Sequence, residues 1–239
     1  MRKSGLNYFE RLGPKPLLRL LVESIVLEDE TVTIKHIILL MKSVDYYRAT
    51  YYEFTSIIMD DNTKSYVAQW LDLLEKQHRQ TYAVLAGISE EKLWARPAPG
   101  EWSIGEILDH TRVLNRSFRR LIAVAWPLLR PWSRLRRARP WLANIDDVYA
   151  RPNFPMSVGW LWPPRHKPGS GVTLAQLEAE SSAEYRKIRA WYSNKEEDML
   201  GNTYFYDPVI GWLNLVQVLR VAAWHDDLHF RDVGKMRNE

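Results

Sequence analysis

Trp-Ser-Ile-Gly-Glu-Ile-Leu-Asp-His, residues 102–110, is the stretch that decides the fold of this chain of 239 residues. Ser103 followed three positions later by Glu106 is a capping box, which predicts that a helix begins here. His110 then lies about two turns into that helix. A second stretch, His-Asp-Asp-Leu-His at 225–229, places two imidazoles four positions apart, on one face of another helix. Three histidines from two helices suit a metal site with an open position, as in catalytic zinc sites.

Apolar residues recur with the helical period in four segments of roughly 20 residues, which predicts an all-α fold built as a four-helix bundle. We expect these helices at 66–86, 103–127, 173–192 and 213–232. Gly87, Pro127 and Gly234 are expected to end the first, second and fourth helices.

The positions of the histidines along these helices select the topology of the bundle. His110 lies near the start of the second helix, whereas His225 and His229 lie in the last turns of the fourth. In an up-down-up-down bundle these two helices run parallel, and the histidines would lie about 20 Å apart at ~1.5 Å per residue. An up-down-down-up bundle makes the helices antiparallel and brings the histidines to one level. It needs a long crossover between the second and third helices, and residues 127–172, about 45 residues rich in Pro, Trp and Arg, supply one.

Residues 1–62 differ in pattern from the rest, which predicts an N-terminal extension followed by the bundle at 63–239. The alternating, β-branched stretch 31–38 favours a strand, and with residues 25–27 it could form a β-hairpin. Residues 19–38 also weakly resemble the C-terminal tail of large serine recombinases, without any catalytic segment. A remnant of a gene fusion is therefore one interpretation, and an accessory hairpin or a poorly ordered extension is the other.

The composition excludes several classes of site. The chain has no cysteine, so disulfides, zinc–thiolate sites and a cysteine nucleophile are excluded, and a metal would need nitrogen and oxygen ligands. The net charge of +4 comes from a run of arginines between 112 and 139, which permits contact with phosphate or acidic lipid; a solvated helix face is the simpler interpretation. No apolar stretch approaches the ~20 residues of a membrane span, and the start of the chain is a poor signal peptide, so we expect a cytoplasmic protein.

These motifs resemble the DinB/YfiT-like superfamily, especially its broad DinB-like subgroup. The resemblance begins near Ala68 and continues to the end of the chain. It rests on Pro-Gly-Glu followed by the stretch quoted above (99–110), on Asp-Pro-Val-Ile-Gly-Trp-Leu-Asn (207–214), and on Trp-His with the second histidine (224–229). Many members have His-Pro where this chain has Asp207-Pro208, a departure that lies away from the histidines.

The resemblance implies an up-down-down-up bundle and a divalent metal ion, zinc or nickel, held by His110, His225 and His229. Members are often dimers, and the characterised ones are thiol-dependent transferases or a thiol-assisted isomerase. We therefore expect a metal-dependent enzyme of the thiol S-transferase or a related detoxifying or hydrolytic type. Its reactants would be a small electrophile and a low-molecular-weight thiol, with the metal activating the thiol or a water.

Two other functions stay open at this point. The chain could be a non-catalytic, metal-stabilised module that binds an acidic partner through the Trp/Arg-rich crossover. The basic crossover could also contact nucleic acid or a membrane surface, although it lacks the repeated stacking motifs that specific nucleic-acid binding needs.

The residues around the metal ligands are predicted with less detail. Glu106 is a candidate hydrogen-bond acceptor for a ligand imidazole, but its role in the capping box is the favoured interpretation. Asp226 and Asp227 are expected to face outward, and His78 is expected to be a core histidine. His36 and His166 are expected to have no cluster of ligand residues around them.

Overall fold

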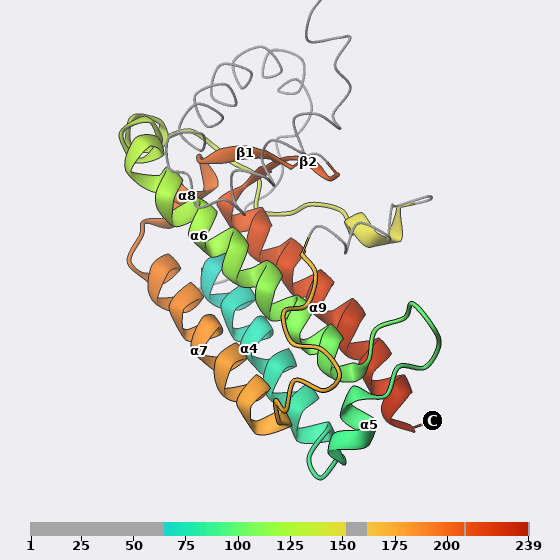
Figure 1. The fold of residues 1–239 in the computed structure, drawn as a ribbon. Helices are drawn as coiled ribbons and strands as arrows, with labels where there is room; N and C mark the ends of the chain where they lie inside the picture. The colour runs from blue at the N-terminus through green and yellow to red at the C-terminus, as the bar shows by residue number, and fades with distance from the viewer. Residues whose placement is uncertain (1–64, 152–161, 208, 239) are drawn as a thin grey trace, which may run out of the picture. The chain divides into compact units, whose positions relative to one another are not determined.

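The computed structural model describes residues 65–151, 162–207 and 209–238, so the predicted extension at 1–62, its hairpin and its boundary lie outside the described residues. Within them, four long helices dominate (Figure 1): α4 (Tyr66–Val84), α6 (Ile104–Arg136), α7 (Leu174–Ser193) and α9 (Leu215–Asn238). The shorter elements are α5 (Glu90–Trp94), the 3₁₀ turn η1 (Val148–Ala150), α8 (Glu197–Gly201), β1 (Tyr204–Asp207) and β2 (Gly211–Asn214). No helix among the described residues has the length and apolar character needed to cross a membrane.

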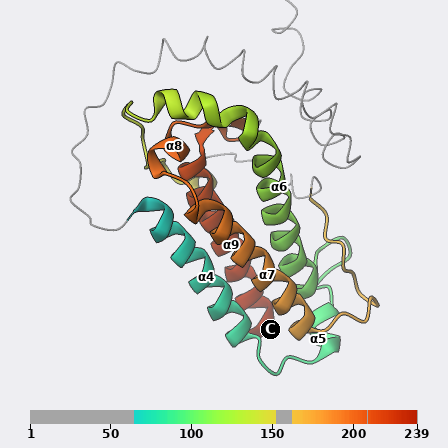
Figure 2. The same ribbon diagram turned by 90° about the vertical axis from the view of Figure 1, so that its left-hand side faces the viewer.

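One core cluster shows how the four long helices run. It joins Tyr82 near the end of α4, Ile104 at the start of α6, Leu177 at the start of α7 and Val233 near the end of α9. α6 and α7 therefore run in one direction and α4 and α9 in the other, as Figures 1 and 2 show. α4 packs on α9 and α7, and α6 packs on the same two helices. This is the predicted up-down-down-up bundle, with α6 and α9 antiparallel neighbours.

The helix starts follow the local sequence signals. At α6 the Ser103 side chain accepts from the Glu106 N–H, and the Glu106 side chain accepts from the Ser103 N–H, which completes the predicted capping box. At α7 the same reciprocal bonds join Thr173 and Gln176. These caps satisfy backbone donors that have no partner within the helix.

The prediction that Pro127 ends the second helix was wrong, because α6 continues through Pro127 and Pro131 to Arg136. Each proline removes one backbone hydrogen bond and crowds the preceding turn, and α6 bends in this part (Figure 2). Beyond the prolines the helix still buries Ser133, whose hydroxyl bonds the Thr203 hydroxyl and the Leu129 carbonyl. These contacts hold the last turns in place, and the crossover before α7 is shorter than predicted.

The prediction that Gly234 ends the fourth helix was also wrong. α9 runs through Gly234 to Asn238. A glycine in a helix costs about 1 kcal/mol relative to alanine, but the neighbouring Val233 is fully buried at the end of the bundle. The Lys92 ammonium group also donates to the Arg237 carbonyl at 2.8 Å, at the last turn.

Residues 204–213 lie outside the compact unit that the helices form. They hold β1 and most of β2 as a two-stranded sheet, between the predicted third and fourth helices, where the sequence predicted no strand. The Asp207 carboxylate accepts the N–H groups of Val209 and Ile210 at 2.8 and 2.9 Å, and Gly211 has a φ of 102°. This turn is therefore formed by an aspartate side chain that bonds the backbone two and three residues later, and by a glycine in the left-handed region.

Gly105 provides a test of the packing at the start of α6. A Cβ added there would lie 2.6 Å from a ring carbon of Trp94, whose Nε1 donates to the Val172 carbonyl at 2.9 Å. We expect Gly105→Ala to lower the free energy of unfolding by a net ~1–2 kcal/mol, since overpacking outweighs the gain in helix propensity. Gly234→Ala is the matched control, because a Cβ there meets nothing within 4 Å, and it should be neutral or stabilising. Equal stability of Gly105→Ala and the wild type in denaturant titrations would contradict this packing.

Candidate metal centre

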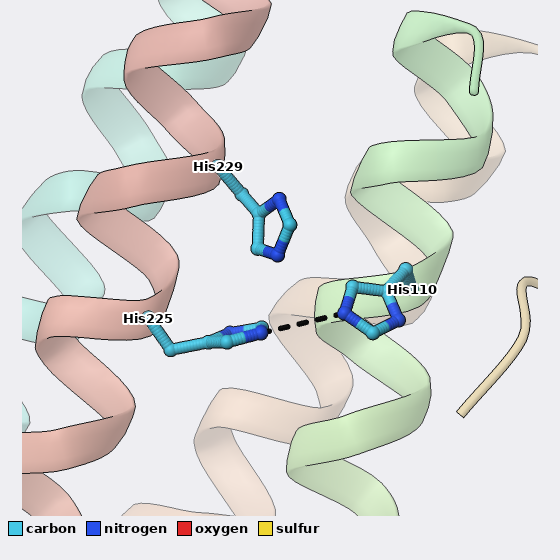
Figure 3. Close-up of side chains that lie close together, drawn as sticks. All are labelled: His110, His225 and His229. Carbon is cyan, nitrogen blue, oxygen red and sulfur yellow. Dashed lines mark hydrogen bonds between the residues drawn. The ribbon is translucent and has the colours of Figure 1, made fainter. Parts of the chain in front are cut away.

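The antiparallel arrangement of α6 and α9 brings the three predicted histidines together (Figure 3). One ligand atom from each of His110, His225 and His229 lies within 4.8 Å of the other two. The Nε2 atoms of His110 and His225 are 3.3 Å apart, and the ring centroid of His229 lies 5.0 Å from that of His110 and 4.5 Å from that of His225. His110 and His225 are buried, and His229 is half-buried. Such a set of nitrogens could hold a metal ion; binding itself stays a prediction.

A hydrogen bond to the backbone sets the tautomer of the buried His110 ring. His110 Nδ1 lies 2.7 Å from the Trp162 carbonyl oxygen, which only accepts, so Nδ1 carries the proton. His225 Nδ1 lies 3.4 Å from the carboxylate of its chain neighbour Asp226, a contact too long to decide which nitrogen of that ring carries the proton. Nε2 is the unprotonated nitrogen of His110, and it lies 3.3 Å from His225 Nε2, at the hydrogen bond drawn in Figure 3. A metal ion held here would bind the lone pair on His110 Nε2.

Burial also keeps the imidazoles neutral. It lowers the pKa of His110 and of His225 to about 4, and for His110 the neighbouring His225 lowers it further. Burial and then the two other imidazoles lower the pKa of His229 to about 3. At neutral pH all three rings are therefore neutral, with one ring nitrogen free of a proton, which is the state that binds metals.

A sequence model of the DinB superfamily matches residues 73–233, which include all of α6 and α7, most of α4 and α9, and the three histidines. The chain belongs to the DinB superfamily. Among solved structures, it is similar to that of YfiT from Bacillus subtilis, described as "a probable metal-dependent hydrolase with an unusual four-helix bundle topology". The identity is 13%, the TM-score is 0.49, and the match covers 78% of this chain and 92% of that one. No curated protein matches the chain.

In this DinB-superfamily chain, Asp226 faces inward, contrary to the prediction. It is fully buried and accepts hydrogen bonds from the Tyr185 hydroxyl at 2.5 Å and the Asn115 amide at 3.1 Å. α9 packs against both α4 and α6, so adjacent positions such as 225 and 226 both face neighbouring helices. Burial raises the pKa of Asp226 to about 6, so the carboxylate is ionised at neutral pH and supports the His225 ring. Asp227 is half-exposed and pairs with Arg231, as its predicted outward position requires.

Glu106 and His78 have the roles that the sequence favoured. Besides closing the capping box, Glu106 pairs with Arg96, whose Nε and Nη2 donate to its carboxylate at 2.8 and 2.5 Å. His78 is buried between Tyr82 and Tyr185, and its Nε2 bonds the Ser182 hydroxyl at 2.8 Å. Burial lowers the pKa of His78 to about 4.

A second group of ligand-type side chains comprises Asp109, His166 and Glu180, so the expectation that His166 has no such residues around it was wrong. Arg112 already neutralises this group, since its guanidinium lies 2.5 Å from the Asp109 carboxylate and 3.2 Å from that of Glu180. A metal ion here would have to share these carboxylates with a fixed positive charge. The group is therefore an ion-pair cluster that links α6, α7 and the end of the crossover.

Aromatic side chains surround the three histidines. Trp102 lies against His110 with ring centroids 4.7 Å apart, and Tyr149 lies 6.1 Å from His225. Trp162 reaches the centre through its carbonyl, which accepts from His110, while its ring packs on Phe118 with centroids 5.7 Å apart. Tyr149 and Trp162 both come from the crossover, a segment without any periodic signal, so the sequence did not indicate them.

Proposed function

We propose that His110, His225 and His229 hold a divalent metal ion and that the chain is a metal-dependent enzyme. The observation that carries this proposal is the convergence of one ring nitrogen from each histidine within 4.8 Å of the others, with Nε2 of His110 left unprotonated by the Trp162 carbonyl on its opposite ring nitrogen. The lowered pKa values of the three rings support it, as does membership of the DinB superfamily.

The donor set favours zinc or nickel. Imidazole nitrogens suit borderline ions, and three protein ligands leave a position open for a reactant. When bound, such an ion would lower the pKa of a coordinated water or thiol towards neutrality. Asp226 and the Trp162 carbonyl hold two of the rings in place, while Trp102 and Tyr149 provide apolar surface next to them.

We further propose that the reaction is transfer of a low-molecular-weight thiol to a small electrophile, or a related hydrolysis, of the detoxifying type. The three imidazoles are neutral and leave the full charge of the ion available to activate the attacking group. The chain has no cysteine, so the sulfur in such a transfer must come from a second substrate.

The test uses the full chain, produced without a polyhistidine tag and analysed for bound metal. We expect about one divalent ion per chain, as three ligands from a single site require. The turnover of the metal-stripped protein is then compared with that of protein reloaded with zinc or nickel. Each assay contains a generic aryl halide and one of a panel of cellular thiols, or water alone. Turnover that requires both metal and thiol supports the transferase; turnover that requires metal alone supports hydrolysis. Absence of metal-dependent turnover with every thiol and with water would reject the enzyme.

A second function, a module that binds an acidic partner, rests on the surface of α6 beyond its bend. Leu128, Trp132 and Leu135 are exposed there, Leu135 by 80%, and exposed Arg130 and Arg134 lie beside them. Apolar and cationic side chains together suit an acidic surface. We expect any such binding to DNA or anionic vesicles to fall steeply with added salt. Binding that is absent, or that salt does not weaken, would eliminate this function.

A further inference from the structure

We propose that Asp109 is the positioning residue for His110, and that it acts through the backbone of residues 162–166 rather than through the imidazole itself. This inference rests on the proposed function, in which His110 supplies a ligand nitrogen. Asp109 precedes His110 in α6, but its carboxylate lies against the end of the crossover.

The Asp109 carboxylate is fully buried and has four hydrogen-bond donors. One oxygen accepts from the Arg112 guanidinium at 2.8 and 2.5 Å. The other accepts the backbone N–H groups of Arg165 and His166 at 2.5 and 2.8 Å. The ion pair with Arg112 does not depend on the two backbone N–H groups, so their bonds to Asp109 have an effect of their own. The two bonds to Arg165 and His166 fix the crossover to α6 next to the metal centre.

Two prolines connect this anchor to His110. Trp162 is followed by Pro163 and Pro164, and Arg165 comes next. Each proline ring fixes φ near −65°, so the short segment between Trp162 and Arg165 is stiff. Holding the Arg165 backbone therefore also holds the Trp162 carbonyl, which accepts from His110 Nδ1 at 2.7 Å.

The consequence for His110 is a fixed tautomer. A carbonyl held on Nδ1 keeps the proton there and leaves Nε2 as the free ligand atom that faces His225. If the Trp162 carbonyl moves away, the proton is free to move to Nε2, and the ligand atom is blocked. Asp109 thus controls which nitrogen of His110 is available.

The first test variant is Asp109→Asn. An amide has one oxygen and one NH₂ group in place of the two carboxylate oxygens. In either orientation the NH₂ group therefore faces two of the four donors, and it cannot accept their hydrogen bonds. Glu184→Gln is the matched control, because Glu184 is a buried carboxylate on α7 that pairs with Arg119 on α6. A second variant, Pro163→Gly combined with Pro164→Gly, leaves Asp109 and Arg112 intact and loosens only the connection.

Two measurements are made on the full chain. Nitrogen NMR of labelled histidine, in metal-stripped protein, reports the His110 tautomer. Titration with zinc reports affinity, and loss of an outer partner of a ligand typically weakens it by about 10–100-fold. We expect the proton on Nδ1 in the wild type and Glu184→Gln, and a mixture of tautomers with zinc affinity lowered in that range in Asp109→Asn and in the double glycine variant.

The outcomes separate this inference from the proposed function. If the wild type does not bind zinc but the tautomer still changes in both variants, the metal site fails and the positioning role stands. An unchanged tautomer in a folded Asp109→Asn or double glycine variant overturns the positioning role, even if the melting temperature falls. If Asp109→Asn does not fold, the double glycine variant decides the question in the same way.

Discussion

The His225→Ala variant is expected to lose metal binding by more than the ~10–100-fold that removal of an outer hydrogen-bond partner costs. His225 provides one of the three nitrogens, and its Nε2 faces that of His110 at 3.3 Å. Its loss leaves two imidazoles for one ion and also removes the ring that Asp226 supports. Zinc titration of the metal-stripped full chain, followed by metal analysis after dialysis, measures the effect.

His166→Ala is the matched control for that experiment. His166 lies in the ion-pair cluster with Asp109 and Glu180 and not among the three candidate ligands; its imidazole bonds Glu180, and the hydrogen bond that it donates to Asp109 comes from its backbone N–H. We expect this variant to bind zinc within a few-fold of the wild type. Wild-type affinity in His225→Ala would show that these histidines are not the site.

Acidification from pH 6.5 to 4 is expected to destabilise the metal-free protein strongly. His110, His225, His229 and His78 have pKa values lowered by burial to about 3–4 in the folded chain, against 6.5 when unfolded. Between those pH values the unfolded chain binds protons that the folded chain does not, so stability is present above pH 6.5 and falls below it. Asp226 acts in the opposite direction, because burial raises its pKa from 3.8 to about 6, but it is one group against four.

Thermal unfolding in the presence of a chelator, followed at intervals across this pH range, tests the prediction. His78→Gln should show a shallower dependence, since it removes one of the four groups without touching the candidate ligands. A melting temperature that stays constant between pH 7 and 4.5 would mean that the imidazoles are not held neutral by burial. Zinc should raise the melting temperature at pH 7 and lose that effect in acid, where protons compete for the rings.

The sequence predicted those features that depend on short-range signals or on regular spacing. The capping box of Ser103 and Glu106 marked the start of α6. His110 lies near the start of its helix and His225 and His229 near the end of theirs, so a shared site required antiparallel helices. Spacing along a helix converts directly into distance, so the topology followed from a few residues.

The failed predictions concern places where distant contacts outweigh local preference. Pro127 and Gly234 are strong local breakers, yet α6 continues past the proline because Ser133 and Arg136 are buried in its later turns. α9 continues past the glycine, where Met236 packs partly buried against the core cluster and Lys92 bonds the Arg237 carbonyl. Asp226 was expected to be outward because a carboxylate is usually solvated, but Tyr185 and Asn115, far away in the sequence, provide its hydrogen bonds. The contributions of Trp162 and Tyr149 come from irregular backbone, where no period relates sequence to position.

His110 and His225 are 115 residues apart in the sequence. An ion shared by α6 and α9 would close a loop of that length, and a cross-link over so long a loop restricts the unfolded chain considerably. Metal binding at the centre would then add directly to the free energy of unfolding of the chain. Resistance of the protein to unfolding would become a measure of how much metal the cell supplies to it.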